Sequence, residues 1–349
     1  MKRILLVSPF PPYIGGVSVS VQRLSEQLIK DGYYVDKFNT QTWNKRFNNK
    51  VIKFLKYLGL PLFLAFSRRY DVIHFHVSKI VPKLYVSLWR QLFSRETKFI
   101  LTIHGYAGNA FRSKRGHLAL RGFDRIICVK QGDRENMPSD YLMKTAEIPA
   151  FIPPVIEDND ALKFPRDLEL FLNRDSFRML INGFVITKGN YNDLYGLRDA
   201  VILLEKLRKM GRNADLIIIV LGSDSEIFVR DLKTYIKSAD LEGNIFWMEG
   251  ANGELWPLLK RVNVLLRPTK TDGDAMSVRE ALYLKVPVIT SDVVPRPDGS
   301  VVYKSGSQQD ILDKTIWLID NYDSHVASII ARNTGENFAK KIIQQYESN

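Results

Sequence analysis

The stretch from Asn263 to Val293 constrains this chain most, because it predicts a strand, a polar loop, a helix and a second strand in immediate succession. Two short apolar runs, Val264–Leu266 and Val286–Ile289, are typical of buried strands. Between them, a turn rich in Thr, Asp and Gly precedes a helical run from about Met276 to Leu284. A βαβ unit of this kind sets the loop at the carboxyl edge of a parallel sheet, where ligands bind.

Carboxylates and free backbone N–H groups gather where this loop enters the helix. Asp272 lies in the loop, and Glu280 lies about one turn into the helix, facing the same edge. Asp274 or Ser277 can cap the first turn. Two carboxylates so placed can hold sugar or ribose hydroxyls, while the N–H groups hold a diphosphate. An isolated Asp and Glu at this spacing would otherwise be a solvated pair on a helix surface.

Lys285 stands where a different residue is expected. A helix that turns directly into a strand usually ends through a left-handed residue, normally Gly. A Cβ makes that conformation cost roughly 1–2 kcal/mol. The sequence therefore predicts that Lys285 has a positive φ, with Pro287 preventing the helix from continuing.

The loop and helix resemble the signature of retaining glycosyltransferases of family 4, in which two Glu residues are separated by seven others. Asp272 occupies the first Glu position, and Glu280, followed by ALYLKVPVITSD, is similar to the second Glu and its continuation. The resemblance implies a GT-B fold: two Rossmann-like, doubly wound α/β domains facing a central cleft. It also implies retaining transfer of a sugar from a UDP- or GDP-linked donor to a glycan or polyprenyl-diphosphate-linked acceptor, in polysaccharide or glycoconjugate synthesis.

The resemblance also assigns residues to roles. His104 and Asp272 would be catalytic residues beside the donor sugar, and Glu280 would bind the ribose. Family members carry a Gly-rich donor loop after the first strand, a Lys on the diphosphate and N–H groups at the signature helix. The donor-binding set implied for this chain is Gly15, Gly16, Lys188, Arg267, Asp274, Ala275, Met276, Ser277 and Glu280.

The chain departs from the family pattern at three positions. Phe184 stands where the family has Arg, and Arg267 could supply that missing charge. Lys285 replaces a Gly, and Asp272 is one methylene shorter than Glu. These departures keep two alternatives open, namely a nucleotide-sugar-binding pseudoenzyme and a nucleotide-sugar 2-epimerase of the same fold.

The resemblance implies neither a metal nor a cofactor besides the donor. Asp272-Gly273-Asp274 imitates the Asp-x-Asp manganese site of the other glycosyltransferase fold. In that fold, however, the motif follows an early nucleotide-binding unit, whereas here it stands late in a second domain. The sequence therefore predicts a metal-independent enzyme.

The positive charge of the chain lies entirely in its first half. Residues 1–150 hold 25 Lys and Arg against 10 Asp and Glu, whereas the whole chain has a net charge of +12. This asymmetry predicts an anionic partner for the first half. Trp43–Tyr70 mixes basic and aromatic residues, as an interfacial helix on an anionic membrane does. Nucleic acid is not expected, because no RNP, KH or helix-turn-helix pattern is present.

The 349 residues predict two domains rather than one core. The expected parts are an N-terminal acceptor-side domain at 1–155, a linker at 156–172, a C-terminal nucleotide-sugar domain at 173–322, and a helix at 323–349 that packs back on the first domain. Cys128 is the single cysteine, which fits a reducing cytoplasm. Without a run of about 20 apolar residues, we expect a cytoplasmic protein that associates peripherally with the membrane.

Overall fold

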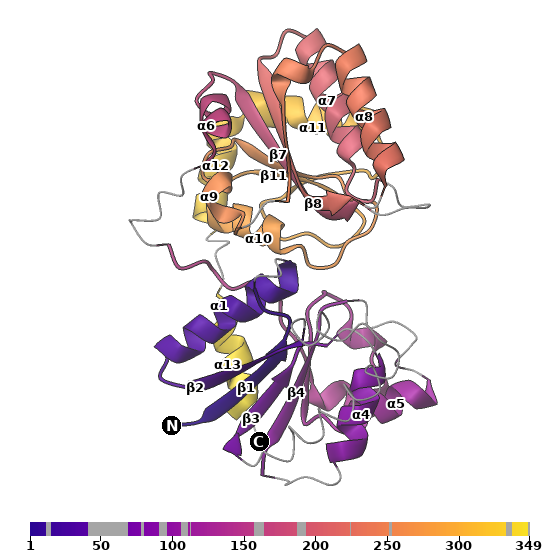
Figure 1. Ribbon diagram of the computed structural model, residues 1–349, viewed down its shortest axis with the longest axis vertical. Helices are drawn as coiled ribbons and strands as arrows, with labels where there is room; N and C mark the ends of the chain where they lie inside the picture. The colour runs from indigo at the N-terminus through magenta and orange to yellow at the C-terminus, as the bar shows by residue number, and fades with distance from the viewer. Residues whose placement is uncertain are drawn as a thin grey trace. The chain divides into compact units, whose positions relative to one another are not determined.

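The computed structural model describes residues 1–11, 15–40, 69–77, 80–90, 96–105, 111, 113–156, 164–186, 193–223, 225–250, 253–332 and 337–347. The chain forms two compact units (Figure 1). Unit 1 comprises Met1–Ile152 and Asn337–Asn349, and unit 2 comprises Pro153–Glu336. Lys188 and all but the last two residues of Trp43–Tyr70 lie outside the described residues.

Unit 1 is built on a six-stranded parallel sheet with the order β2-β1-β3-β4-β5-β6. Its central strands are almost wholly buried, as a parallel sheet covered on both faces requires, whereas the edge strand β2 is partly exposed. The strands are β1 (Arg3–Ser8), β2 (Tyr34–Asn39), β3 (Val72–Phe75), β4 (Lys98–Ile103), β5 (Arg125–Cys128) and β6 (Thr145–Glu147).

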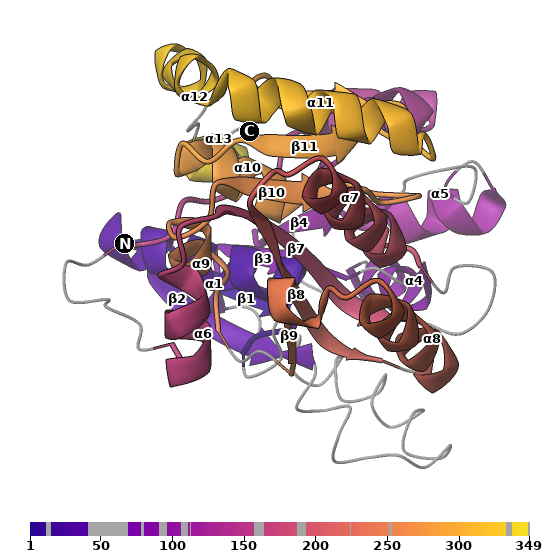
Figure 2. The same ribbon diagram turned by 90° about the horizontal axis from the view of Figure 1, so that it is seen from above.

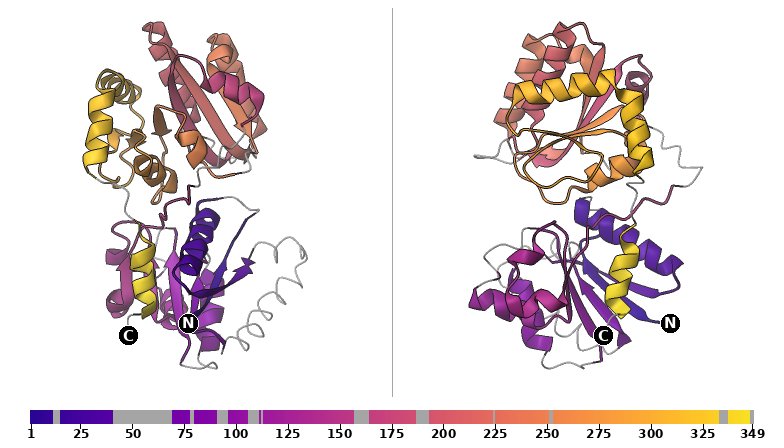
Figure 3. Two further views of the ribbon diagram at one scale, coloured as in Figure 1. Left: turned by 90° about the vertical axis from the view of Figure 1, so that its left-hand side faces the viewer. Right: turned by 180° about the vertical axis from the view of Figure 1, so that it is seen from behind.

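Helices cover both faces of this sheet. One face packs against side chains of α4 (Ile80–Arg90) and α5 (Lys114–Arg121) in a single hydrophobic cluster. The opposite face carries α1 (Gly16–Lys30) and the C-terminal helix α13 (Ala339–Glu347), which lies against the sheet of unit 1 although its sequence follows all of unit 2 (Figure 3). Two short 3₁₀ helices, Arg134–Asn136 and Ser139–Lys144, connect β5 to β6.

Unit 2 is built on a second six-stranded parallel sheet with the order β12-β11-β10-β7-β8-β9. Its strands are β7 (Phe177–Ile186), β8 (Ala214–Ser223), β9 (Ile245–Glu249), β10 (Val264–Arg267), β11 (Val288–Ser291) and β12 (Val301–Tyr303). A 3₁₀ turn, Glu242–Asn244, leads into β9. Among the described helices of both units, none is long and apolar enough to cross a membrane.

The helices of unit 2 form a layer on each face of its sheet. One cluster contains side chains of α7 (Leu197–Lys209), α8 (Glu226–Ser238) and α11 (Gln308–Asp320). Helices α7 and α8 lie side by side in this layer (Figure 2). The other cluster joins the sheet to α6 (Arg166–Leu172), α9 (Trp256–Leu259), α10 (Met276–Tyr283) and α12 (Tyr322–Ala331).

Two predicted boundaries are wrong. The second half of the expected linker, 156–172, is helix α6, whose Leu168, Phe171 and Leu172 are buried in the core of unit 2. The expected single C-terminal helix is two helices, α12 and α13. Helix α12 belongs to unit 2, and only α13 returns to unit 1. In both places the core of unit 2 buries a segment, α6 or α12, that the sequence placed outside that domain.

Strand order locates the edge at which each sheet can bind a ligand. In unit 2 the chain leaves β7 toward β8 on one side and later enters β10 on the other side. In unit 1 it leaves β1 toward β2 and then enters β3 on the opposite side. Ligands of open α/β sheets bind at such switch points, outside the carboxyl ends of the strands. The loops after β7 and β10, and those after β1 and β3, are therefore the candidate positions.

Candidate functional site

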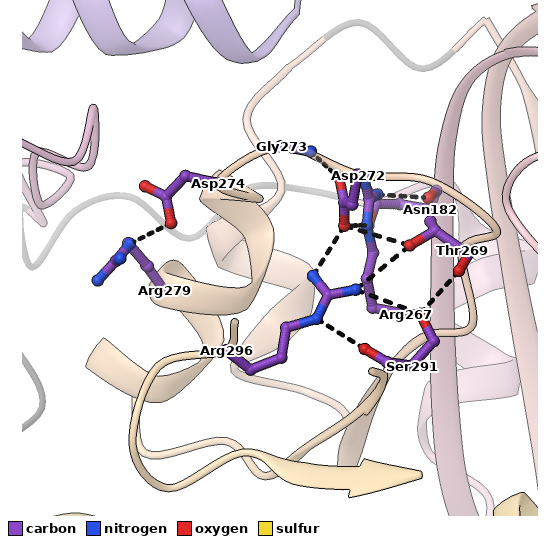
Figure 4. A network of polar contacts seen from close by, with 9 residues as sticks. All are labelled: Asn182, Arg267, Thr269, Asp272, Gly273, Asp274, Arg279, Ser291 and Arg296. Carbon is purple, nitrogen blue, oxygen red and sulfur yellow. Dashed lines mark hydrogen bonds and ion pairs between the residues drawn. The ribbon is translucent and has the colours of Figure 1, made fainter. Parts of the chain in front are cut away.

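Arg267 and Asp272 form the centre of the site in unit 2, at the switch point between β7 and β10. Arg267 is the last residue of β10, and Asp272 lies in the loop that leads to α10. The Arg267 guanidinium donates two hydrogen bonds to the Asp272 carboxylate, from Nε and from Nη2, each 3.0 Å long (Figure 4). Such a bidentate pair is both strong and geometrically specific.

Asp272 accepts further hydrogen bonds from three directions. Arg296 Nη1 lies 2.9 Å and Thr269 Oγ1 3.2 Å from Oδ2, while the N–H of Gly273 donates to Oδ1 at 3.0 Å. A carboxylate has about four lone-pair positions, so these donors and Arg267 occupy it fully. In this arrangement Asp272 orients two arginines and the loop. Its contact with the donor sugar stays a prediction.

Arg296 is the residue of this site that the sequence did not reveal. It follows β11 and is almost fully buried. Its Nε donates to the carbonyl of Ser291 at 2.9 Å, and Nη2 approaches the hydroxyls of Thr269 and Ser291 (Figure 4). Arg296 thus ties the loop after β11 to the loop after β10. The available signal was a lone Arg between two prolines, after a strand that ends at the same sheet edge.

The electrostatics of this cluster follow from burial and pairing. Burial alone would raise the pKa of Asp272, but the charges and hydrogen bonds of Arg267 and Arg296 hold it below its usual range. Burial likewise opposes the charge of Arg267, and the Asp272 carboxylate outweighs this effect and raises the arginine's pKa. Asp272 and Arg267 are therefore charged at neutral pH. Because Arg296 adds a second guanidinium, the cluster has one positive charge in excess.

The N-terminus of α10 has no side-chain cap. Its N-cap is Ala275, and the first hydrogen bonds of the helix run from Val278 and Arg279 to the Ala275 carbonyl. The prediction that Asp274 or Ser277 caps this turn is wrong, because Asp274 instead forms a 2.6 Å ion pair with Arg279. Met276 and Ser277 are the first two residues of the helix, so their N–H groups have no acceptor within it and point toward the helix start, where an anion is favoured.

Helix α7, which follows β7 at the same edge, begins differently. The Asp193 carboxylate accepts hydrogen bonds from the N–H groups of Leu197 and Arg198, at 2.6 and 3.1 Å. The N-terminus of α7 is therefore already occupied by a carboxylate. Of these two helix starts, the one at α10 is open to an anionic ligand.

Two glycines let side chains and loops approach this site closely. A Cβ on Gly196, which has a φ of 71°, would lie 2.3 Å from the carbonyl oxygen of Pro268, so Gly196 permits α7 to begin against the loop after β10. A Cβ on Gly183 would lie 2.8 Å from the ring of Tyr195. That ring lies 5.7 Å from the Arg267 guanidinium, close enough for a cation–π contact.

Asp272 and Asp274 pair with different arginines. Asp272 binds Arg267 and Arg296, whereas Asp274 binds Arg279 in a pair that stands apart from Asp272 (Figure 4). Among the described residues, no group of His, Cys, Asp and Glu is arranged to hold a metal ion.

The structure describes the positions of two further expected donor-binding features, Glu280 and the glycine pair Gly15–Gly16. Glu280 is 4% exposed and lies on α10 among apolar residues of the core. Gly15 is the N-cap of α1, and Gly16 is the first residue of that helix. The Ser18 hydroxyl accepts from the Gly15 N–H at 2.9 Å, so part of this helix start is capped by its own chain.

Three histidines, His74, His76 and His104, lie together at the carboxyl edge of the sheet of unit 1 and form the histidine cluster. His74 lies in β3, His76 follows it, and His104 follows β4. His76 Nδ1 lies 2.8 Å from His104 Nε2. His74 contacts the Thr102 hydroxyl at 2.7 Å and the Tyr346 hydroxyl of α13 at 2.8 Å.

The histidine cluster is neutral at neutral pH. Burial lowers the pKa of His104 to about 4, and burial together with His104 lowers that of His74 to about 3. Burial and both neighbouring imidazoles also lower the pKa of His76. A neutral imidazole donates one hydrogen bond and accepts one. His104 therefore offers hydrogen bonding, without charge, at the end of β4.

Two family models match the chain. The family model described as Glycosyltransferase Family 4 matches residues 14–154, and the one described as Glycosyl transferases group 1 matches residues 181–342. No curated protein matches the chain by sequence.

Solved structures resemble the chain along almost its whole length. The HepE protein of Anabaena, solved in complex with UDP-glucose, is 12% identical with a TM-score of 0.70, covering 99% of this chain and 98% of the other. Sucrose-phosphate synthase from Thermosynechococcus elongatus is 15% identical with a TM-score of 0.65, covering 99% and 95%. The lipopolysaccharide outer core galactosyltransferase WaaB is 15% identical with a TM-score of 0.65, covering 98% of each chain. At these identities the likeness shows the fold.

Proposed function

The chain belongs to the GT-B glycosyltransferases of family 4, and from this premise we propose that it transfers a sugar, with retention, from a nucleoside-diphosphate sugar to a glycan or lipid-linked acceptor. Glycosyltransferase activity is the function shared by the matching families. The observation that carries the donor assignment is the open N-terminus of α10 beside Arg267 at the switch point of unit 2. A UDP-linked donor is the first to test, because the HepE structure holds UDP-glucose.

We assign the diphosphate, the ribose and the sugar of the donor to different protein groups. The diphosphate binds at the N–H groups of Ala275, Met276 and Ser277, with the excess positive charge of the arginine cluster nearby. Glu280 accepts the ribose hydroxyls, and His104 donates to the donor sugar. Lys188, Gly15 and Gly16 remain predicted donor contacts.

The cluster supplies the electrostatics that the reaction needs. Negative charge builds up on the leaving diphosphate as the glycosidic bond breaks, and fixed positive groups stabilise it without reorganising. Arg267 and the α10 N-terminus are held in place by Asp272 and Arg296 before the donor arrives. We therefore propose that transfer continues in the presence of EDTA. Loss of activity on chelation, restored by a divalent cation, would contradict this.

Nucleotide binding tests the donor site directly. Calorimetric titration should show that UDP or GDP binds more tightly than uridine or guanosine. Glu280→Gln should weaken binding of both nucleoside and diphosphate roughly ten- to a hundredfold, because a charged acceptor bond contributes about 1.5–3 kcal/mol. Glu242→Gln, on the exposed 3₁₀ turn before β9, is the matched control. Unchanged affinity in the Glu280 variant would remove its assignment.

Product analysis tests the reaction. NMR of the product should show the anomeric configuration of the donor, whereas an inverted product would contradict retention. Consumption of the donor without any acceptor would favour the epimerase alternative. Tight nucleotide binding without turnover on any acceptor would favour the pseudoenzyme.

The acceptor side is proposed to meet an anionic membrane surface, at which a polyprenyl-diphosphate-linked acceptor would be presented. The support in unit 1 is α5, whose Lys114, Arg115 and Arg121 are exposed together with Leu118. Cations around an apolar side chain suit an anionic leaflet. In flotation, the protein should bind anionic vesicles but not neutral ones, and Lys114→Glu/Arg115→Glu should weaken that binding. Absence from both lipid fractions would favour a soluble acceptor.

A further inference from the structure

The histidine cluster follows from strand periodicity. Side chains two residues apart on a strand point to the same face. Ile73 and Phe75 of β3, with Leu101 and Ile103 of β4, enter one hydrophobic cluster. The alternate positions, His74, His76, Thr102 and His104, therefore share the other face, which α13 covers through Tyr346.

The position of one proton determines which of His76 and His104 donates the hydrogen bond between them. Their nitrogens lie 2.8 Å apart, so one imidazole donates and the other accepts. Neutral imidazole carries a single N–H. If His76 Nδ1 donates, His104 carries its proton on Nδ1. If His104 Nε2 donates, His76 must carry its proton on Nε2.

The surroundings of His76 distinguish these two arrangements. His76 is 5% exposed, and the described residues offer its Nε2 no hydrogen-bond partner. In the second arrangement this nitrogen would be a buried N–H without an acceptor. Buried N–H groups without acceptors are rarer in folded proteins than under-satisfied acceptors. The first arrangement, with a bare Nε2 on His76, is therefore the more stable one.

The ring of His76 is also held in orientation. It packs against the His74 ring with a centroid separation of 4.1 Å. His74 is fixed in turn by hydrogen bonds that join its two ring nitrogens to the hydroxyls of Thr102 and Tyr346, one nitrogen donating and the other accepting. The hydroxyl of Tyr33 also bonds to Glu347 at 3.0 Å, which fastens the end of α13. The C-terminal helix thus supports the side chain that contacts His104.

We propose that His76 is a positioning residue that donates to His104 Nε2 and thereby holds His104 as the neutral tautomer protonated on Nδ1. His104 then presents a hydrogen-bond donor, and no basic nitrogen, beyond β4. Such a group binds a hydroxyl or phosphate oxygen of a ligand and does not remove a proton from it. The part of this inference that concerns the ligand rests on the proposed function, whereas the tautomer does not.

The tautomer is measurable in the free protein. Two-bond ¹⁵N–¹H correlation spectra of ¹⁵N-histidine-labelled protein at pH 7.5 should show His104 protonated on Nδ1. His76→Leu removes the donor, and His104 should then shift toward the Nε2–H tautomer. His76→Asn retains an amide donor and should restore the wild-type pattern at least in part. His117→Gln, on α5, is the control and should leave the His104 signals unchanged.

Turnover provides the second readout. His76→Leu should lower kcat about tenfold or more while leaving the affinity for the nucleoside diphosphate unchanged, and His76→Asn should recover part of kcat. An Nε2–H tautomer of His104 in the wild-type protein would overturn the proposal, even if His76→Leu fails to fold. An unchanged tautomer and unchanged kcat in folded His76→Leu would overturn it as well. If the wild type transfers no sugar but shows the Nδ1–H tautomer, the proposed function fails and the role of His76 in setting the tautomer stands.

Discussion

Replacing Lys285 by Gly should stabilise unit 2, although the change removes a whole side chain. Lys285 has a φ of 66°, which confirms the left-handed residue predicted at the end of α10. The N–H of Val286 bonds to the carbonyl of Ala281 at 2.8 Å, and that of Lys285 to the carbonyl of Leu282 at 3.0 Å. These two hydrogen bonds define a Schellman motif, which requires a left-handed residue at this position.

Other helices of the chain provide the comparison. Helices α1 and α7 end through the same pair of hydrogen bonds with Gly32 and Gly211, whose φ values are 87° and 76°. Helix α8 ends through Asp240 with a φ of 54°. Asp tolerates the left-handed region better than most residues do. Lys285 is therefore the most strained of these four ends.

Two opposing effects set the change in the free energy of unfolding that we expect for Lys285→Gly. Removing the Cβ relieves roughly 1–2 kcal/mol of left-handed strain. Gly also gives the unfolded chain more conformations, which costs about 0.4–1 kcal/mol. The net gain therefore lies between about zero and about 1.6 kcal/mol, and each kcal/mol corresponds to about 2–4 °C in Tm for a unit of this size.

Urea unfolding, followed with a probe in unit 2, measures this difference. Lys285→Ala keeps the Cβ and should stay within about 0.5 kcal/mol of wild type. Gly211→Ala is the reverse experiment: a Cβ there has no neighbour within 4 Å, so the variant measures the conformational cost alone. It should lose about 1 kcal/mol.

The comparison between the two Lys285 variants decides the outcome. Lys285→Gly should be at least as stable as Lys285→Ala. If the Gly variant is less stable than the Ala variant by 0.5 kcal/mol or more (roughly the scatter of surface substitutions), backbone strain at this helix end does not govern its stability.

Three further predictions concern burial. Arg296→Met should lower the free energy of unfolding by about 3 kcal/mol or more, because it removes a buried partner of Asp272; urea unfolding that matches wild type would show that Arg267 alone satisfies the carboxylate. Gly196→Ala should cost more than Gly211→Ala in the same assay, since its Cβ would meet backbone at 2.3 Å; equal losses would mean that the loop yields freely. Because the pKa of His104 is about 4 in the fold and about 6.5 when unfolded, it binds more protons unfolded, so its contribution to stability should fall as pH drops from about 6.5 toward 4, by up to about 1.4 kcal/mol per unit. His74 and His76, whose pKa values are also lowered, add to the total fall. Urea midpoints at pH 7.5 and 5 test this, and a fall of the same size in His104→Gln would contradict it.

Local sequence chemistry determined the elements around α10. Strand β10 and helix α10 appear where the apolar runs placed them, and β11 begins at Val288, two residues after the predicted start. The left-handed Lys285 follows from the short turn before β11. Such features depend on hydrogen bonds and sterics within a few residues. They can therefore be predicted without knowing what the rest of the chain does.

The tertiary structure decided which charged groups meet. Arg296 reaches Asp272 across 24 residues, because β10 and β11 end side by side. From the sequence, Arg267 was expected to supply a positive charge to the donor site. In the structure Arg267 is the partner of the buried Asp272 carboxylate, which orients it. A buried carboxylate takes whichever donors the neighbouring loops bring within 3 Å, and loop positions depend on strand order.

The C-terminal segment also separates what the sequence determined from what the tertiary structure decided. The sequence predicted one helix at 323–349 that returns to the first domain. The structure divides this segment, so that α12 packs in unit 2 and only α13 joins unit 1, where Tyr346 reaches His74 across 272 residues. Helix formation is local because its hydrogen bonds link residues four apart, whereas burial is shared among all the segments that compete for one core. The sequence alone therefore determined the strands and the helix around the α10 loop, whereas the assembled sheets decided where α6, α12 and α13 pack and which side chains meet at the sheet edges.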